Sequence, residues 1–209
     1  MKKALLMMVV SVMSLPLFSQ LLKWTPDFPV ENTTPFEITL NDASKGNGSL
    51  YFYTPTSDVY VHTGVITNLS TSNSDWRYVR PGDFNTPVPA LNAPYVTSTF
   101  PSKWKFTITG GIRAYYGITN PMETILKIAI LFRNGNGSKV QRNADGSDMY
   151  IPVSDGSLKV KFTTPFIQPT FTPIPETITK AVGDAIAVTA IASSLPASTS
   201  MKIYFNGSQ

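Results

Sequence analysis

The sequence predicts an all-β protein, an antiparallel Ig-like β-sandwich followed by the incomplete start of a second Ig-like β domain. Three observations lead to this prediction: short runs of alternating polar and apolar residues, frequent Asn-Gly and Asp-Gly turn signals, and the lack of sustained helical periodicity. Only 14% of the 209 residues are charged. This fraction is well below the average for soluble proteins and argues against a helical bundle or a coiled coil.

Residues 1–19 have the pattern of a secretory signal peptide. Lys2 and Lys3 precede an apolar run at residues 4–12, and a small residue, Ser19, ends the segment. The apolar run is shorter than the roughly 20 residues that a helix needs to cross a bilayer, so we expect no transmembrane segment. We therefore expect an exported protein of a Gram-negative bacterium, either secreted or held at the cell surface.

The strands of the first module, residues 21–164, are predicted from period-two alternation between turn signals. In residues 59–62 and 104–108, alternate side chains fall on one face, as a half-buried strand requires. Residues 122–130 are compatible with a helix, but their apolar content favours a buried strand. We predict strands at residues 36–40, 50–53, 59–64, 104–109, 126–132, 149–153 and 157–162.

The clearest hairpin signal joins the last two of these segments. Residues 149–154 and 157–162 flank Asp155-Gly156, a dipeptide that tolerates the positive φ angles of a tight turn. We therefore expect these two segments to pair with each other as part of the sandwich.

The second module is expected to be truncated. Residues 165–175 are rich in proline, which is typical of an extended linker. Beyond the linker we predict three strands, at residues 176–180, 185–191 and 201–205, and three strands do not close a sandwich. We interpret residues 176–209 as the start of a second Ig-like module that is continued by downstream domains of the same protein.

Composition excludes several classes of function. The formal net charge is +4, and the 17 Lys and Arg residues form no cluster that would follow a phosphate backbone, so we expect no nucleic-acid partner. With one His and no Cys, the chain lacks the ligands for a multi-histidine or thiolate metal site. The sequence contains no nucleotide-binding loop or nucleophile motif, and its acidic residues lie mostly in turns, so we assign no catalytic residue.

One loop has the composition of a calcium site. Residues 143–148 read Asn-Ala-Asp-Gly-Ser-Asp, but placing Gly146 at the glycine position of a calcium loop puts Gln141 and Pro152 where carboxylates belong. A turn rich in Asn and Asp is the interpretation that we favour, with Ca²⁺ as the alternative. We assign no cofactor to the chain.

Aromatic residues are the more informative feature. Trp104 begins an alternating strand and is expected in the core, whereas Trp76 lies in a polar loop. Two roles are open for Trp76: an exposed platform for the C–H face of a sugar, or a cap folded back on the sandwich. His62 lies near the end of the strand predicted at residues 59–64, beside loops, where a ligand-binding role and a structural role are both open.

Together these segments resemble a family of starch-binding β-sandwich modules. The arrangement is also similar to the N-terminal Ig-like region of secreted α-amylase-family glycoside hydrolases. The resemblance covers residues 36–162. It is based on a strand ending His-x-Gly at residues 59–64, Trp76 in the next loop, a Trp-bearing strand at 104–108, a Phe-containing strand at 128–133, and an Asn/Asp/Gly loop leading to a Tyr-bearing strand at 143–152.

The resemblance implies which residues bind the sugar. His62 matches the family's sugar-contacting histidine and Trp76 its first stacking ring. Residues 140–143, at the place of the family's second stacking tryptophan, contain none. We expect tyrosines to supply a substitute ring and the Asn/Asp loop to bond sugar hydroxyls. These further candidates are Tyr78, Tyr115, Tyr116, Asn143, Asp145 and Asp148.

The observations lead to one hypothesis and two alternatives. The leading hypothesis is a non-catalytic module that binds starch or another α-glucan, at the N-terminus of an exported α-amylase-like glycoside hydrolase. The first alternative is an Ig-like structural spacer of a secreted or cell-surface protein that binds no sugar. The second is an enzyme with its own pair of catalytic carboxylates. An exposed aromatic pair would favour sugar binding, and a buried Trp76 would favour the spacer.

Overall fold

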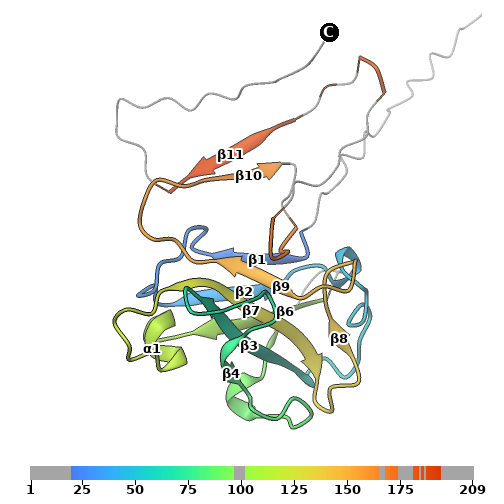
Figure 1. The fold of residues 1–209 in the computed structure, drawn as a ribbon. Coiled ribbons are helices and arrows are strands. Elements are labelled where there is room, and N and C mark those ends of the chain that lie inside the picture. Colours follow the sequence, from blue (N-terminus) through green and yellow to red (C-terminus); the bar gives the residue numbers. More distant parts are fainter. Residues whose placement is uncertain are drawn as a thin grey trace, which may run out of the picture.

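The computed structural model describes residues 20–96, 102–164, 168–173, 181–183, 185 and 187–193. The predicted signal peptide and the strands predicted at residues 176–180 and 201–205 lie outside these residues. Within them the fold is all-β, as predicted, because the chain forms antiparallel sheets (Figure 1). The described part contains one short α-helix, α1 (Ile112–Tyr116), and two short 3₁₀ helices, η1 (Ala43–Lys45) and η2 (Pro89–Leu91).

Two antiparallel sheets form the sandwich. The first has the strand order β1-β2-β6-β5, and the second has the order β4-β3-β7-β8, with β9 also paired to β7. The strands of the first sheet are β1 (Leu22–Thr25), β2 (Phe36–Leu40), β5 (Tyr95–Val96) and β6 (Lys103–Ile108). Those of the second are β3 (Val59–Thr67), β4 (Arg77–Arg80), β7 (Ile125–Asn134), β8 (Val140–Gln141) and β9 (Met149–Pro152).

The core combines alternate residues from both sheets into one buried cluster. Ile38 of β2 and Trp104 of β6 are fully buried, and so are the cross-strand partners Val61 and Phe132 of β3 and β7. The expectation that Trp104 lies in the core is therefore confirmed. Its indole N–H donates to the carbonyl of Thr56 at 2.8 Å, which satisfies the one polar atom of this ring.

The predicted hairpin between residues 149–154 and 157–162 is wrong. β9 pairs with β7, and the chain that follows it is held by other segments, since the N–H of Val153 donates to Leu126 and that of Ser154 to Pro29. The next strands form a separate two-stranded sheet. This sheet consists of β10 (Val160–Thr164) and β11 (Thr189–Ala192), so the strand predicted from residue 185 begins later.

Residues 50–53 form consecutive turns rather than the predicted strand. The N–H of Tyr51 donates to the carbonyl of Gly48 at 3.0 Å, and Phe52 has a φ angle of 57°, which no strand adopts. Leu50 is nevertheless fully buried, and its N–H donates to the side-chain oxygen of Gln141. The apolar side chain thus reaches the core from a turn.

The described part of the predicted linker, residues 168–173, is packed against the second sheet. The carbonyl of Pro169 accepts a 2.7 Å hydrogen bond from the N–H of Tyr150, and the ring of Phe171 packs edge-on against Tyr150. The ammonium group of Lys127 lies 3.8 Å from the centroid of Phe171. This segment is therefore held on the sandwich instead of spanning a gap as a free spacer.

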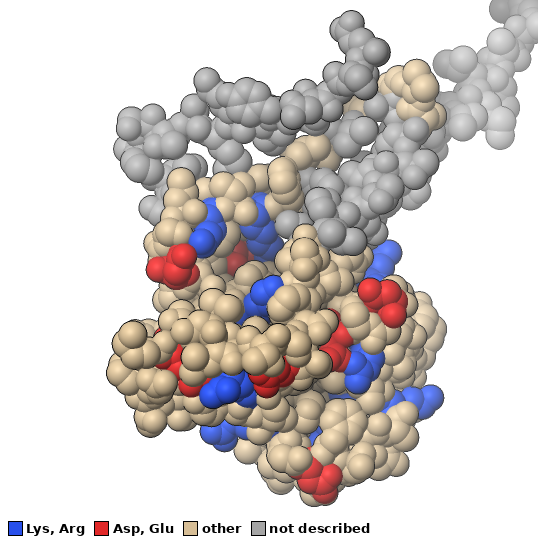
Figure 2. Space-filling model, viewed as in Figure 1, with Lys and Arg blue, Asp and Glu red and all other residues tan. Residues whose placement is uncertain are grey.

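Charged side chains are sparse on the face of the molecule shown in Figure 2, and both signs are interspersed among uncharged residues. Some opposite charges form ion pairs at the surface, such as Lys105 and Glu37, with 2.8 Å between nitrogen and oxygen. This face therefore carries mixed charge rather than a continuous field of one sign.

Candidate functional site

The candidate site lies on the second sheet, where Gly64 of β3 leaves room for the edge strand. A Cβ atom at Gly64 would lie 3.0 Å from the carbonyl oxygen of Arg77 and 3.4 Å from the Cβ atom of Trp76. Because residue 64 has no side chain, the segment that carries Trp76 packs directly on the backbone of β3.

A β-bulge in β4 shapes the site further. The pairs Thr63–Arg80 and Val65–Arg77 are three residues apart on β4 but two apart on β3, and Tyr78 within the bulge has a φ angle of 54°. Bulges redirect side chains at sheet edges. Here the redirected strand forms part of the wall of two hollows.

The first of these, the His62 hollow, has a volume of about 340 Å³. It brings together three of the sequence-predicted site residues, His62, Trp76 and Asp148. They come from β3, from the loop before β4 and from the loop before β9. The hollow is lined by His62, Ser74, Trp76, Val79, Phe84, Leu131, Arg142 and Asp148.

Trp76 is partly buried in the wall of the His62 hollow. Its exposure is therefore intermediate between that of an open sugar platform and that of a cap folded back on the sandwich. Its ring stacks on His62, with centroids 5.7 Å apart and planes inclined by 27°. Its indole N–H donates to the hydroxyl of Tyr150 at 3.2 Å. Trp76 is thus a fixed ring with restricted exposure rather than a freely exposed platform.

His62 is a neutral imidazole within the hollow. Burial, followed by the charges of Arg133 and Arg142, lowers the pKa of His62 to about 4. Its Nδ1 is shielded from solvent and has no hydrogen-bond partner in the described part of the chain. Phe84 packs edge-on against it at 4.8 Å, so the histidine lies between two aromatic rings.

Two arginines, Arg142 and Arg133, form the polar contacts in and next to the His62 hollow. Arg142 pairs with Asp148 at the lining of the hollow. Arg133 is fully buried, and its guanidinium donates to three backbone carbonyls, including that of Thr86 at 2.8 Å. The same guanidinium lies 5.3 Å from the ring centroid of Phe84. Arg133 therefore holds the loop that places Phe84 beside His62.

The second hollow, the Arg80 hollow, has a volume of about 450 Å³ and shares Val79 with the first. It contains the three tyrosines proposed as substitute rings, but only Tyr115 and Tyr78 are partly exposed. Tyr116 is buried, and its hydroxyl lies 2.6 Å from that of Thr63. The Arg80 hollow is lined by Tyr78, Val79, Arg80, Pro81, Gly82, Val88, Ala90, Leu91, Tyr115 and Tyr116.

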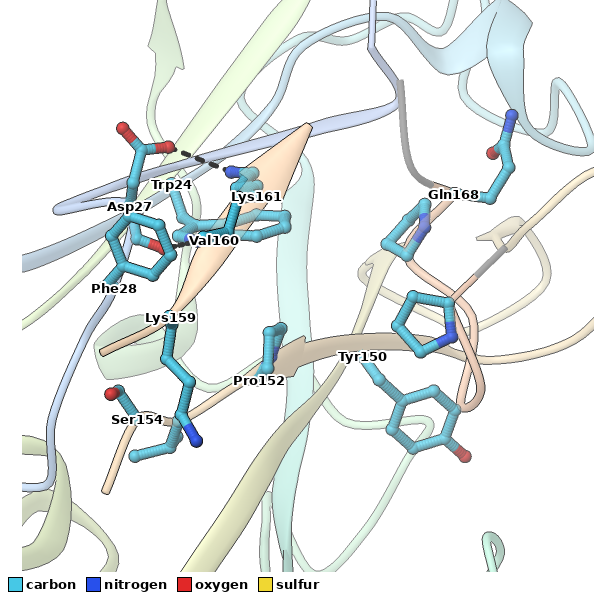
Figure 3. A pocket seen from close by; sticks show the side chains of 13 residues that line it. Trp24, Asp27, Phe28, Tyr150, Pro152, Ser154, Lys159, Val160, Lys161 and Gln168 are labelled. Carbon is cyan, nitrogen blue, oxygen red and sulfur yellow. Dashed lines mark hydrogen bonds and ion pairs between the residues drawn. The ribbon is translucent and has the colours of Figure 1, made fainter. Parts of the chain in front are cut away.

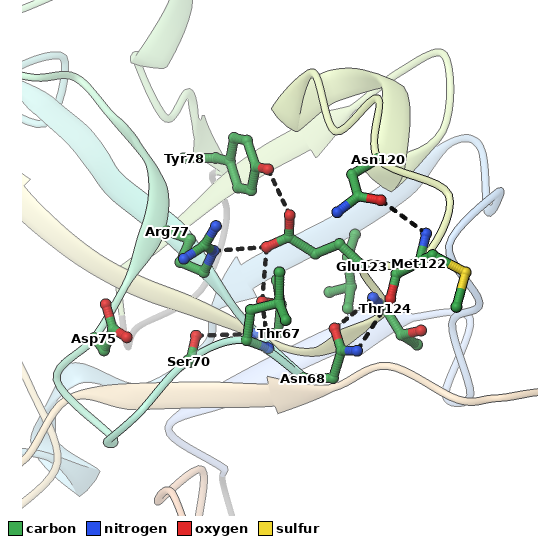
Figure 4. A network of polar contacts seen from close by, with 12 residues as sticks. Thr67, Asn68, Ser70, Asp75, Arg77, Tyr78, Asn120, Met122, Glu123 and Thr124 are labelled. Atoms are coloured by element: carbon green, nitrogen blue, oxygen red, sulfur yellow. Dashed lines mark hydrogen bonds and ion pairs between the residues drawn. The ribbon is translucent and has the colours of Figure 1, made fainter.

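A buried carboxylate holds β4 in place (Figure 4). Glu123 accepts hydrogen bonds from Arg77 Nε at 2.6 Å, Tyr78 Oη at 2.7 Å and Thr67 Oγ1 at 2.8 Å. Burial alone would raise the pKa of Glu123, but these three donors together lower it below its usual value. The Tyr78 hydroxyl is therefore committed to the Glu123 network rather than free for a ligand.

The remaining candidates, Asn143 and Asp145, lie outside the lining of both hollows. The side-chain amide of Asn143 is buried and donates to Ser147 and to the carbonyl of Asp148. Asp145 accepts two hydrogen bonds from Ser147, which is the pattern of an Asx turn. No group of three or more His, Cys, Asp or Glu side chains suited to a metal ion occurs among the described residues.

A third hollow of about 300 Å³ lies where β10 meets the sandwich, and its lining is mostly apolar (Figure 3). Trp24 is part of this lining, and its indole N–H donates to the carbonyl of Asp27. The ammonium group of Lys161 lies 3.9 Å from the centroid of Trp24 and pairs with the Asp27 carboxylate. A lysine thus occupies the space over this ring, and Trp24 offers no free platform.

Sequence reasoning missed Phe84, Arg142 and Arg80 as lining residues. Phe84 and Arg80 lie in or beside a loop without periodicity, so no pattern connected them to His62. One signal was available: Arg133 is a charged residue within an otherwise apolar strand, and a buried cation implies that neighbouring segments supply its acceptors.

Comparison with models of protein families and with curated proteins found no match to this chain. None of the helices in the described ranges is both long enough and apolar enough to span a membrane.

Proposed function

We propose that this chain is a non-catalytic carbohydrate-binding module whose His62 hollow receives a sugar ring. The observation that carries the proposal is the stack of His62 on Trp76 in the wall of a hollow that also contains Arg142 and Asp148. Sugars require an apolar surface for their C–H faces and nearby polar groups for their hydroxyls. The His62 hollow offers both.

Each residue of the hollow has a distinct part in this binding. The rings of Trp76 and Phe84, both in contact with His62, supply the apolar surface. The neutral imidazole of His62 adds a flat ring to the lining, beside the indole of Trp76. Asp148 accepts from a second hydroxyl while Arg142 holds its carboxylate in position.

Starch or another α-glucan is the ligand class that the sequence resemblance implies. In this proposal the module is the N-terminal, accessory part of an exported α-amylase-family glycoside hydrolase. Binding to the polymer would raise the local concentration of substrate around a downstream catalytic domain. We assign no role in bond cleavage to the residues that the structure describes.

Titration of the chain with maltoheptaose, by calorimetry and tryptophan fluorescence, tests the proposal. We expect saturable binding of this α-glucan, and we expect Trp76→Ala to abolish it. Trp24→Ala is the matched control, because Trp24 lies outside the hollow and should leave binding unchanged. If maltoheptaose produces neither heat nor a fluorescence change, or if Trp76→Ala binds it like the wild type, the proposal is wrong.

A structural spacer is the second candidate, favoured by the packing of Trp76. This ring packs against the main buried cluster and against a smaller one formed by Ile66, Ala129 and Tyr150. It also bonds Tyr150, as a residue that caps a sandwich would. In that case Trp76→Ala lowers the free energy of unfolding, and maltoheptaose does not bind to the wild-type chain.

A further inference from the structure

We propose that Phe171 positions Trp76 for its ligand through Tyr150, which contacts both rings. Docking of residues 168–173, the segment that contains Phe171, therefore sets the affinity of the His62 hollow for its sugar. This inference rests on the proposed function and adds a positioning residue that lies outside the hollow.

Four rings form a continuous row along the second sheet. Phe171 packs edge-on against Tyr150 with centroids 5.3 Å apart, and Tyr150 packs edge-on against Trp76 at 6.1 Å. Trp76 in turn stacks on His62 at 5.7 Å. Trp76 and Phe171 also pack against the same small buried cluster, the one that includes Tyr150. Because packed side chains leave little free space, a shift of one ring displaces the next.

The hydroxyl of Tyr150 fixes the loop that contains Trp76. It donates to the carbonyl of Asn73 at 2.7 Å and accepts from the indole N–H of Trp76 at 3.2 Å. Asn73 and Trp76 both belong to the loop before β4, and so does Ser74, which lines the His62 hollow. One side chain therefore holds the part of this loop that forms the wall of the hollow.

The segment 168–173 holds Tyr150 from the other side. The carbonyl of Pro169 accepts from the N–H of Tyr150 at 2.7 Å, and Phe171 covers a ring that is only 4% exposed. The ammonium group of Lys127 holds Phe171, because it donates to the carbonyl of this residue and lies 3.8 Å from its ring centroid. Undocking of the segment removes these restraints from Tyr150.

The segment itself does not line the His62 hollow, so its effect on a bound sugar passes through Tyr150 and Trp76. Such a coupling is reciprocal: if the docked segment strengthens sugar binding, the sugar strengthens docking by the same factor. The backbone N–H of Tyr150 reports on docking, because its hydrogen bond to Pro169 breaks when the segment opens.

The test compares Phe171→Ala with Phe28→Ala in titrations with maltoheptaose. Phe28 is also half-buried and lines the third hollow, but it makes no ring contact with Tyr150 within the described ranges. We expect Phe171→Ala to weaken binding by about threefold to tenfold and Phe28→Ala to change it by less than about twofold. Tyr150→Phe should also weaken binding, and adding Phe171→Ala to it should cost little more, since the connecting hydroxyl is already lost.

A second measurement follows the indole N–H resonances of the three tryptophans without sugar. Phe171→Ala should shift the resonance of Trp76 and speed its exchange with solvent. Trp24 and Trp104 donate to backbone carbonyls elsewhere and should be unchanged. In the wild-type chain, saturating maltoheptaose should slow exchange of the Tyr150 amide by about the factor that Phe171→Ala costs in affinity.

An unchanged Trp76 resonance in Phe171→Ala would overturn the inference, and so would an equal loss of affinity in Phe28→Ala or full additivity in the double variant. If maltoheptaose binding depends on Trp76 but Phe171→Ala binds like the wild type, the proposed function stands and only this inference fails. If the wild-type chain binds no maltoheptaose, the proposed function fails, and the indole resonance alone decides whether Phe171 positions Trp76.

Discussion

Glu123 and Arg77 form an ion pair with 2.6 Å between Oε1 and Nε, and Arg77 is the residue that follows Trp76 in the chain. The carboxylate is 2% exposed and the guanidinium side chain 35% exposed, so the pair joins the interior of the protein to its edge strand. The second carboxylate oxygen bonds Tyr78 in the bulge. Through these two contacts one buried acid fixes the backbone that carries Trp76.

Replacing Glu123 with Gln should therefore destabilise the fold. The change removes charge-assisted hydrogen bonds at a buried position, and we expect a loss of about 2 kcal/mol in the free energy of unfolding at neutral pH. Denaturant unfolding measures the loss. Glu37→Gln is the control, because its pair with Lys105 is exposed on both sides and should contribute less than about 1 kcal/mol.

The same substitution should alter the dependence of stability on acid. Because the folded protein lowers the pKa of Glu123, its contribution is present above the unfolded pKa and is lost as the pH falls through the folded pKa. The wild-type chain should thus lose stability below about pH 4.3, and Glu123→Gln should lose less over the same range. Identical acid profiles for the two proteins would contradict this assignment.

Gly64→Ala should displace β4. The added Cβ would lie 3.0 Å from a backbone oxygen of Arg77 and 3.3 Å from Cγ2 of Val79, and the backbone atom is unable to move without the strand. We expect a loss of about 1–3 kcal/mol, with a change in the fluorescence of Trp76. Gly82→Ala is the matched control, since a Cβ atom there has no neighbour within 4 Å. Equal stability of the two variants would show that β4 adapts freely.

His62 should titrate well below an ordinary histidine. Its pKa of about 4 means that the unfolded chain binds this proton more readily than the folded one, so stability should fall as the pH drops from about 6.5 to 4. His62 is the one histidine of the sequence, so its proton resonances give the titration directly. His62→Gln should flatten the stability profile in this window, and a titration midpoint near 6.5 would refute the burial of the imidazole.

Two adjacent tyrosines should respond differently to loss of their hydroxyls. Tyr116→Phe breaks the buried 2.6 Å contact with Thr63 and should cost about 1 kcal/mol. Tyr115→Phe removes a shielded hydroxyl that has no partner among the described residues, so stability should be unchanged or higher. Thermal unfolding of the pair, measured side by side, checks the contrast, and a larger loss in Tyr115→Phe would reverse it.

The alternation of apolar residues predicted the central strands, because the apolar residues in this pattern are the ones that are buried. Residues 36–40 match β2, and the buried stretch near residues 126–132 lies within β7. β1, β4, β5 and β8 were not predicted, because strands of two to four residues display little periodicity. The equally short β9 was predicted because Asp145-Gly146 and Asp155-Gly156 bound it on either side. The pairing of β10 with β11 was missed for another reason. Asp155-Gly156 indicates a turn, but a turn signal does not determine whether the strands on its two sides pair with each other.

For the site, the sequence indicated some residues but not the surface that joins them. His62, Trp76 and Asp148 lie in one hollow, whereas Asn143 and Tyr116 serve internal hydrogen bonds. The difference arises from burial, which side-chain type alone does not determine. The sequence does not distinguish a tyrosine or asparagine whose polar group faces a ligand from one whose polar group faces a neighbouring strand.

The bulge in β4 also has a consequence for association between molecules. β4 is the outer strand of its sheet, and a regular outer strand presents a row of unpaired amides and carbonyls on which a second chain can align. The shifted register between Thr63–Arg80 and Val65–Arg77 interrupts that row, and the two arginines add charge to it. The β-bulge that shapes the two hollows therefore also disfavours pairing of β4 with the edge strand of a second molecule.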